Sequence, residues 1–375
     1  MAERTDWTGE LARAVQGGVP LVVDPFAELG ARVGVEGAEV LAQLQRWQQE
    51  GLLREISAVM EGSCLGYESA LVAARVAPER LEEAAGVVAE HPTVTHDYER
   101  EHRFNLWFTL AVPREQGLEA VAARLAELAG LEEHHVLPRT ATFKIGVNFD
   151  LRTRRNHTAV QPPAEARGVF SPTERERAMV RALQRPLPLR ERPFAALAEE
   201  AGVEEAELLR FARWLKSERI MRRYVGTLRH RRAGVRANGM ACWRVPVDRH
   251  AEVGPRIAAA PEVSHCYARP AFPGFPFSLY SMLHGPSRQD VLDVAERIAA
   301  GAGIAGGLGE GYLVLFSVRE FKKCRLRYFL PETEAWWRRH GRDSDHSSEP
   351  GMASGSKRVS VSSAQEVGPV AGEPR

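Results

Sequence analysis

The chain of 375 residues is 44% hydrophobic and carries 50 basic residues against 49 acidic ones, a formal net charge of +1. This length suits two to four domains, and the balanced charge argues against a protein that coats nucleic acid. The four cysteines are widely spaced without a CxxC pair, which is typical of reduced thiols rather than of a disulfide frame or a zinc site. The N-terminal segment is polar and no apolar run is long enough to cross a bilayer, so we expect a soluble cytoplasmic protein.

The sequence contains an internal duplication. Pro25-Phe26-Ala27 recurs as Pro193-Phe194-Ala195, 168 residues further on, and the segment 91–98 matches 260–267 at an offset of 169. Chance similarity does not keep its register over such a length. We therefore interpret the chain as two tandem copies of one unit.

Each copy is expected to begin with three helices and a strand-like wing. In the second copy, apolar residues at helical spacing on both sides of Gly202 predict a helix-turn-helix, followed by a wing at 220–228. In the first copy the turn falls at Gly34 and the wing at 52–60.

The remainder of each copy is predicted to fold as a ferredoxin-like βαββαβ domain, which makes the fold class α+β. In the first copy we expect strands at 69–76, 94–98, 104–112 and 141–149, with helices at 78–89 and 118–129. In the second copy we expect strands at 237–245, 263–267, 277–283 and 311–318, with helices at 249–259 and 288–300. The predicted domains are helix-turn-helix units with wings at 1–60 and 173–228, ferredoxin-like domains at 61–152 and 229–330, a linker at 153–172, and a helix end with a disordered tail at 331–375.

A winged helix-turn-helix joined to a ferredoxin-like domain resembles the Lrp/AsnC regulators, so transcriptional regulation is one hypothesis. A recognition helix places its N-terminal residues against bases and phosphates, where basic side chains are required. The corresponding positions here are acidic: Glu36, Glu39, Glu204, Glu205 and Glu207. We therefore expect the helix-turn-helix units to act as packing modules, and we expect no DNA partner.

A His-x-Tyr-x-Arg run occurs in both copies, on the second strand of each predicted sheet. Strand alternation places the three side chains of each run on one face. Arginine pairs with carboxylates, aromatic rings cover a flat ligand, and histidine ligates a metal or transfers a proton. A hairpin of solvated charges is the alternative, and repetition of the run makes it the less favoured one. The two runs are His96, Tyr98 and Arg100, and His265, Tyr267 and Arg269.

Further basic residues gather in the second copy. Because the whole chain is nearly neutral, this local charge indicates an anionic partner, either a polycarboxylate or a nucleic acid. No HExxH motif, GxSxG elbow or phosphate-binding loop suggests another chemistry. The basic residues are Arg219, Arg222, Arg223, Arg229, His230, Arg231, Arg232 and Arg236, followed by Lys322, Lys323, Arg325 and Arg327.

At these residues the sequence resembles the siroheme decarboxylases, which are Lrp/AsnC-related proteins of heme d1 and alternative heme biosynthesis. The runs that carry the resemblance are 100–110 with 143–147, 264–270 with 275–285, and 321–328. The similarity covers about residues 24–330, and the second of these runs is the most specific. Some members of the family consist of two subunits, and this chain resembles a fused form. Pro276-Phe277 departs from the bulkier run of the family at the pocket.

The resemblance implies a carboxy-lyase reaction. Siroheme loses its C12 and C18 acetate carboxyls as carbon dioxide and becomes 12,18-didecarboxysiroheme. The iron tetrapyrrole is the substrate, and no separate cofactor or metal is implied. The two halves are expected to form an internal pseudo-dimer around siroheme, and a homodimer or a complex with related subunits stays open. A heme-responsive regulator that binds a tetrapyrrole without converting it is the alternative.

The chemistry assigns roles to the candidate residues. Loss of carbon dioxide leaves a carbanion that must gain a proton, so His265 is predicted to donate that proton or to face the iron, with His96 or His102 as its counterpart. Other residues are predicted to hold unreactive carboxylates or to line the site. They are Arg100, Arg269, Arg222, Lys144, Lys323, Arg325, Arg327, Tyr98, Tyr267, Trp107 and Tyr280.

Overall fold

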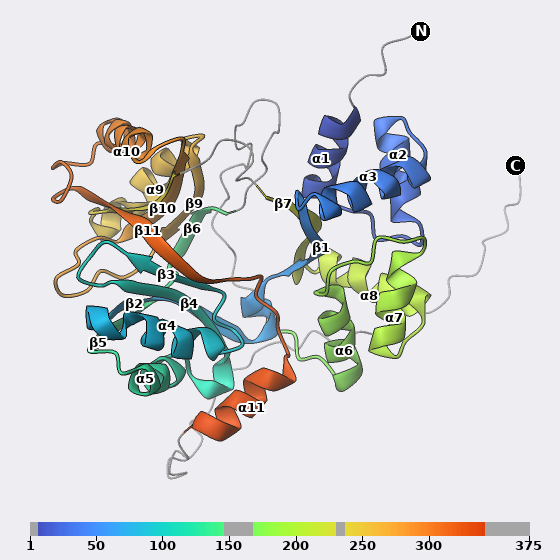
Figure 1. The fold of residues 1–375 in the computed structure, drawn as a ribbon, viewed down its shortest axis with the longest axis horizontal. Coiled ribbons are helices and arrows are strands. Elements are labelled where there is room, and N and C mark those ends of the chain that lie inside the picture. Colours follow the sequence, from blue (N-terminus) through green and yellow to red (C-terminus); the bar gives the residue numbers. More distant parts are fainter. Residues whose placement is uncertain (1–6, 146–167, 230–236, 342–375) are drawn as a thin grey trace, which may run out of the picture.

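The computed structural model describes residues 7–145, 168–229 and 237–341. Two three-helix units lie on one side of the molecule, and a large β structure with helices on its outside lies on the other (Figure 1). Among the described residues, no helix combines the length and apolar character that a membrane span needs. Most of the predicted linker, the predicted tail after Gly341 and the basic residues 230–236 lie outside the described residues.

The two three-helix units share one apolar core. Buried Leu29 and Leu44 of the first unit belong to the same cluster as Phe194 and Leu208 of the second. In both units a glycine with positive φ ends the helix before the turn. The φ angle is +76° for Gly34 and +67° for Gly202. The predicted helix-turn-helix units are thus confirmed. The helices are α1 (Trp7–Gly17), α2 (Pro25–Val33) and α3 (Gly37–Gln49), then α6 (Glu174–Leu183), α7 (Pro193–Ala201) and α8 (Glu205–Ser217).

The two wings pair with each other. Strands β1 (Leu53–Met60) and β7 (Met221–Leu228) form an antiparallel two-stranded sheet. Val59 pairs with Arg223 and Met60 with Met221, so Arg222 is the extra residue of a bulge. A bulge redirects nearby side chains, and here it lies at the arginine-rich part of the wing.

Both ferredoxin-like domains have the predicted order of elements, apart from the last strand of the first copy. That strand was expected at 141–149, but the structure contains two short strands, of which the first begins at residue 133; residues 146–149 lie outside the described ranges. The first domain contains β2 (Tyr67–Arg75), α4 (Leu81–Glu90), β3 (His96–Arg100), β4 (Leu106–Pro113), α5 (Leu118–Ala129), β5 (Glu133–Pro138) and β6 (Ala141–Lys144). The second contains β8 (Ala237–Trp243), α9 (His250–Ala259), β9 (Val263–Ala268), β10 (Leu279–Gly285), α10 (Arg288–Ala302) and β11 (Tyr312–Lys323), and α11 (Pro331–His340) follows.

The last strand of each half crosses to the other half. The first part of β11 pairs with β8 of its own half, and from Ser317 onward it pairs with β3. In the same way β5 pairs with β2, whereas β6 pairs with β9 of the second half. The strand order is β5-β2-β4-β3-β11-β8-β10-β9-β6. Because only Arg139 and Thr140 separate β5 from β6, the two ends of this order meet and the sheet encloses an inner layer.

Helices cover the outer faces, and the inner faces meet each other. Helices α4 and α5 pack on the first half of the sheet, and α9 and α10 pack on the second. Between the two halves lies an aromatic cluster that includes Trp107, Phe275 and Tyr280. Burial of each such side chain contributes about 1.5–3 kcal/mol. The two halves are therefore one cooperative unit rather than two independent domains.

Candidate active site between the two sheet halves

Both His-x-Tyr-x-Arg runs face the inner layer. Tyr98 pairs across the strands with Trp107, a member of the inner aromatic cluster, so alternation places the whole first run on this face. His265 pairs with Met282, which packs against the same cluster and places the second run there too. A proton on His96 lowers the pKa of His265, so the histidines of the two halves interact electrostatically.

Arg100 and Arg269 occupy equivalent places. The guanidinium of Arg100 lies 5.3 Å from the Tyr98 ring centroid, and one of its nitrogens donates to the Leu315 carbonyl at 2.7 Å. Arg269 lies 5.5 Å from the ring of the second-half tyrosine and donates to the Leu137 carbonyl at 2.5 Å. Burial lowers both arginine pKa values to about 10, so both remain charged at neutral pH. Arg100 therefore ties the first half to β11, Arg269 ties the second half to β5, and both place positive charge in the inner layer.

A second group of cations comes from the wing and from the end of β5. Glu61 lies 3.4 Å from Arg222 and 3.8 Å from Arg139. Arg139 also lies 5.7 Å from the Tyr267 ring centroid. The wing sheet thus brings arginines toward the second His-x-Tyr-x-Arg run, with one carboxylate shared between two of them.

Burial and these cations keep both histidines neutral. The pKa of His265 falls to about 3, first because of burial and then because of charges that include Arg222 and Arg223. The pKa of His96 falls to about 4, again mainly by burial and then by Lys323. A neutral imidazole can bind a metal, and it can donate a proton when its other nitrogen is supported.

Two hydroxyl groups hold the inner histidines. Thr95 Oγ1 lies 2.9 Å from Nδ1 of His96, and Ser264 Oγ lies 2.9 Å from Nδ1 of His265. In both rings the neighbouring hydroxyl engages Nδ1 and leaves Nε2 as the nitrogen available for chemistry. The sequence interpretation missed these hydroxyls, although each directly precedes its histidine in both copies. It also missed Arg139.

Several other predicted site residues lie near this group or at its edge. The charge of Lys323 lowers the pKa of His96, and its ammonium group lies 3.7 Å from the Glu320 carboxylate. Arg325 contacts both strands of the wing sheet. Its guanidinium lies 3.1 Å from Glu55 and donates to the hydroxyls of Ser57 in β1 and Thr227 in β7. Arg327 is half-buried on the segment that leads to α11.

Of the remaining predicted residues, Lys144 lies away from the inner histidines, whereas Trp107 and Tyr280 pair across the strands with the tyrosines of the two runs. Lys144 is 3% exposed and donates to the Ala260 carbonyl at the end of α9, at 3.1 Å. His102 stacks on Phe104 with ring centroids 5.7 Å apart, at the aromatic end of the inner layer. Trp107 and Tyr280 also belong to that end. The structure therefore brings His96, His265, their tyrosines and arginines, and the wing arginines together, and it leaves Lys144 outside this group.

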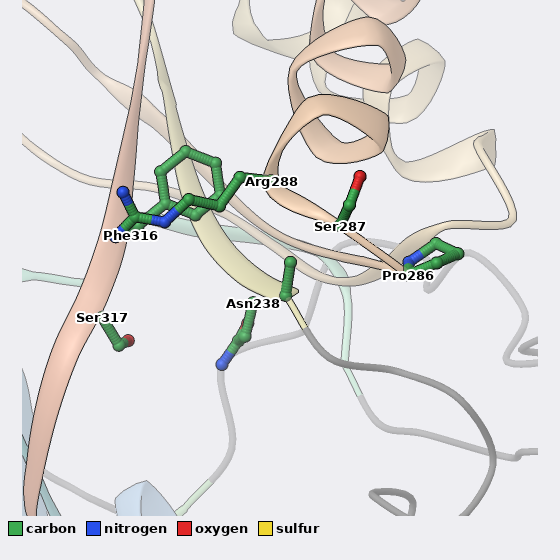
Figure 2. A pocket seen from close by; sticks show the side chains of 7 residues that line it. Asn238, Pro286, Ser287, Arg288, Phe316 and Ser317 are labelled. Carbon is green, nitrogen blue, oxygen red and sulfur yellow. The ribbon is translucent and has the colours of Figure 1, made fainter.

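A small depression opens beside the start of α10 (Figure 2). Arg288 extends over Phe316 there, 4.8 Å from the ring centroid, and pairs with Glu101 at 2.7 Å. Its volume is about 150 Å³, too small for a tetrapyrrole because sites for drug-sized ligands hold about 300–1,000 Å³. It is lined by Ala237, Asn238, Pro286, Ser287, Arg288, Phe316 and Ser317. Across the described ranges, no group of three or more His, Cys, Asp or Glu side chains could hold a metal ion.

Two family models match both halves of the chain. The AsnC-like ligand binding domain matches residues 64–144 and 232–322, and the siroheme decarboxylase NirDL-like HTH domain matches residues 10–54 and 176–222. Each model therefore occurs twice, in alternation, as the internal duplication requires.

Known proteins match nearly the whole chain. A siroheme decarboxylase of Hydrogenobacter thermophilus is 38% identical over 88% of this chain and 97% of its own length. The crystal structure of the siroheme decarboxylase NirDL aligns with a TM-score of 0.70 at 35% identity, covering 89% of this chain and 98% of that one. A crystal structure of NirDL in co-complex with an iron-uroporphyrin III analogue aligns equally well, at 34% identity over the same shares. On this similarity along nearly its full length, the chain belongs to the siroheme decarboxylase family, in the form that carries both units in one polypeptide.

Proposed function

We propose that this protein decarboxylates siroheme, releasing the C12 and C18 acetate carboxyls as carbon dioxide to give 12,18-didecarboxysiroheme for heme d1 or alternative heme biosynthesis. The observation that carries the proposal is that His96 and His265, one from each half, face the same inner layer and interact electrostatically, with arginines around them. A flat polycarboxylate with a central iron matches this combination of imidazoles, tyrosine rings and guanidinium groups.

The arginines are proposed to bind the carboxylates that do not react. Arg100 and Arg269 would act from the inner strands, and Arg222 with Arg139 from the wing side. Binding energy from these remote groups can hold the reacting acetate in an apolar place, where its negative charge is poorly solvated and departure of carbon dioxide is favoured. The aromatic end with Trp107 and Tyr280 would supply that place.

The reacting carbon needs a proton. When the carbon–carbon bond breaks, its electron pair stays on the side-chain carbon and spreads into the ring, and a proton must then complete the methyl group. We propose His265 as the donor and His96 as its counterpart, facing the substrate iron or the second acetate. His102, at the aromatic end, is the third candidate. A positioned general acid contributes about 100- to 10,000-fold to such a step.

The test is anaerobic incubation with siroheme followed by mass analysis. The expected result is loss of two carbon dioxide units with the wild type and almost none with His265→Ala. The absorption spectrum should show that the variant still binds siroheme. His134→Ala is the matched control. That half-buried histidine of β5 directly precedes His135, whose ring stacks on Phe272 in the inner layer, so the His134 side chain points to the opposite face. Full turnover by His265→Ala would remove His265 from the mechanism, and the variants His96→Ala and His102→Ala decide which counterpart is used.

A heme-responsive regulator would need its helix-turn-helix units for DNA. At the start of α8, Glu205 pairs with Arg192, and Glu207 lies 2.7 Å from Arg175. These carboxylates take part in contacts between helices and present no basic surface to phosphates. A gel shift with genomic fragments tests this alternative, and we expect no shifted band.

We also propose that the protein acts in the cytoplasm and binds no membrane. All four cysteines are free thiols, as a reducing compartment favours. The proposed partner is siroheme, and light scattering with and without it tests for further dimerisation.

A further inference from the structure

The two inner histidines have unequal surroundings. Ser264 Oγ lies 2.9 Å from Nδ1 of His265 and 2.7 Å from Nε2 of His284. One hydroxyl thus joins two imidazoles. In the first half, Thr95 makes the equivalent contact with His96, at 2.9 Å. The difference between the halves lies in what stands beyond the hydroxyl.

The strand pairing explains this difference. His265 pairs with Met282 and Val263 with Leu283, so Ser264 is the extra residue of a bulge that lets it reach both rings. In the first half, Thr109 stands opposite His96. Two residues further along that strand, where the second half has His284, stands an alanine at position 111 that is 1% exposed. Within the described ranges, an ionisable side chain therefore stands at this strand position in the second half and not in the first.

The outer end of this chain of groups lies near the molecular surface. His284 is half-buried and pairs across the strands with Asn238. Asn238 lines the depression beside α10 (Figure 2). A proton that enters at this edge of the sheet needs to cross only His284 and Ser264 to reach His265.

We propose that His284 and Ser264 form a proton relay that supplies His265, so that the second half delivers the protons for decarboxylation. This inference rests on the proposed siroheme decarboxylase function. His265 is the catalytic residue in this scheme, whereas the two relay groups act through it and do not touch the substrate.

The charges around His265 explain why a relay is needed. The groups that face it are His284 from β10, His96 from β3, and Arg222 and Arg223 from β7, and all four disfavour a positive imidazole. A neutral imidazole can release its Nε2 proton without becoming an anion only if Nδ1 receives a proton in the same step. Ser264 is the group that lies at Nδ1.

The relay balances as follows. The carbon–carbon bond to the carboxylate breaks, carbon dioxide leaves, and the electron pair remains on the side-chain carbon. Nε2–H of His265 is transferred to that carbon, the Ser264 hydroxyl proton moves to Nδ1, and the Nε2 proton of a protonated His284 moves to the serine oxygen. One proton is consumed for each carbon dioxide. The step leaves His265 protonated at Nδ1, so before the next step it returns to the Nε2–H tautomer by exchange with solvent, which also returns a proton to His284.

The test compares single-turnover rates of carbon dioxide release under anaerobic conditions for the wild type, His284→Gln, Ser264→Ala and Ser264→Thr. We expect His284→Gln and Ser264→Ala to be slower by about 100-fold with unchanged siroheme binding, the lower end of general-acid catalysis. We expect Ser264→Thr to retain most activity, because threonine occupies the equivalent position 95 in the first half. Added imidazole should partly restore His284→Gln.

The sign of the effect separates a relay from simple electrostatics. If His284 acted only through its charge, its loss would raise the pKa of His265 and make protonation of the substrate easier. A His284→Gln variant that is as fast as the wild type, or faster, with the same pH profile overturns the relay and leaves the decarboxylase function intact. A wild type that binds siroheme and releases no carbon dioxide overturns both.

A measurement that needs no turnover completes the test. Nitrogen-15 NMR of the histidine side chains reports the tautomer of His265 in the full chain. We expect Nε2–H in the wild type and a change of tautomer population in Ser264→Ala. An identical spectrum of His265 in both proteins overturns the relay, whatever the activity.

Discussion

Histidines without charge are the most consequential individual residues of this molecule. His96 and His265 have pKa values of about 4 and about 3, and His91, at the end of α4, also falls to about 3, each mainly because of burial. The ordinary value is about 6.5. A polyanionic substrate would offset the surrounding cations and make protonation easier, which couples substrate binding to proton uptake.

These lowered pKa values predict sensitivity to acid. Below about pH 6.5, His96 and His265 bind protons in the unfolded chain but stay neutral in the folded protein. The unfolding free energy therefore falls as pH decreases toward 4 and 3. Replacing His265 by Gln should make this decline shallower. Thermal melting midpoints of both proteins between pH 7.5 and 4.5 provide the measurement, and parallel curves for the two proteins would contradict the expectation.

The arginines of the wing side should govern affinity for siroheme. A charge-assisted hydrogen bond contributes about 1.5–3 kcal/mol, so Arg222→Ala should weaken binding by about 10- to 100-fold. Absorption titration with siroheme measures this change. Arg210→Ala, on an exposed part of α8, is the matched control and should bind as the wild type does. Equal affinities of the two variants would remove Arg222 from the site.

At the scale of elements, β3 carries an unusual residue on its outer face. Asp97 is fully buried, neither of its carboxylate oxygens has a hydrogen-bond partner among the described residues, and burial raises its pKa to about 8. Nearby Lys322 donates to the carbonyls of Ala89 and His91, at 2.5 and 2.9 Å. In the other half, Cys266 and Lys144 occupy the corresponding strand positions.

The raised pKa of Asp97 predicts that the unfolding free energy falls as pH rises from about 4 to about 8. The folded protein holds a proton on Asp97 that the unfolded chain loses near pH 4, so this contribution is present at low pH and disappears as pH rises through about 8. Asp97→Asn, which stays neutral, should therefore melt at a higher temperature than the wild type at pH 9, with a smaller difference at pH 6. An equal difference at both pH values would count against this account.

The sequence predicted most elements because their apolar periodicity is strong, and it failed where that signal is weak. Strand β5 was missed because Leu137 is its only fully buried side chain and two adjacent histidines interrupt its alternation. The wings were predicted, but their mutual pairing was not, since no local pattern in β1 indicates a partner in β7. The hydroxyls before His96 and His265 could have been found from the repeat alone.

At the scale of the whole molecule, the exchanged strands make the two halves mutually dependent. Among the described strands, β6 pairs only with β9, and the second part of β11 pairs with β3. Sequence periodicity predicted that strands exist in both halves, and the family resemblance implied that the halves form a pseudo-dimer. It could not show the exchange, because pairing between distant segments leaves no local signal.

This exchange predicts the behaviour of a divided chain. Cutting between residues 145 and 168 and producing both fragments together should give a complex that copurifies and converts siroheme, because all strand pairings can still form. Either fragment produced alone should aggregate or remain unfolded, since its edge strands and half of the inner layer would be exposed. Size-exclusion chromatography and circular dichroism distinguish these cases. A folded, monomeric fragment would show that the halves are independent.

One feature of this duplicated molecule bears on how its halves can diverge. In an assembly of identical subunits, every substitution appears on both sides of the symmetry axis at once. Here a substitution in one repeat leaves the other repeat unchanged. The corresponding positions 284 and 111, with His284 and Ala111, differ in this way, as do Asp97 and Cys266. Two symmetry-related positions of one fused chain can therefore acquire different functions, which is impossible in a dimer of identical chains.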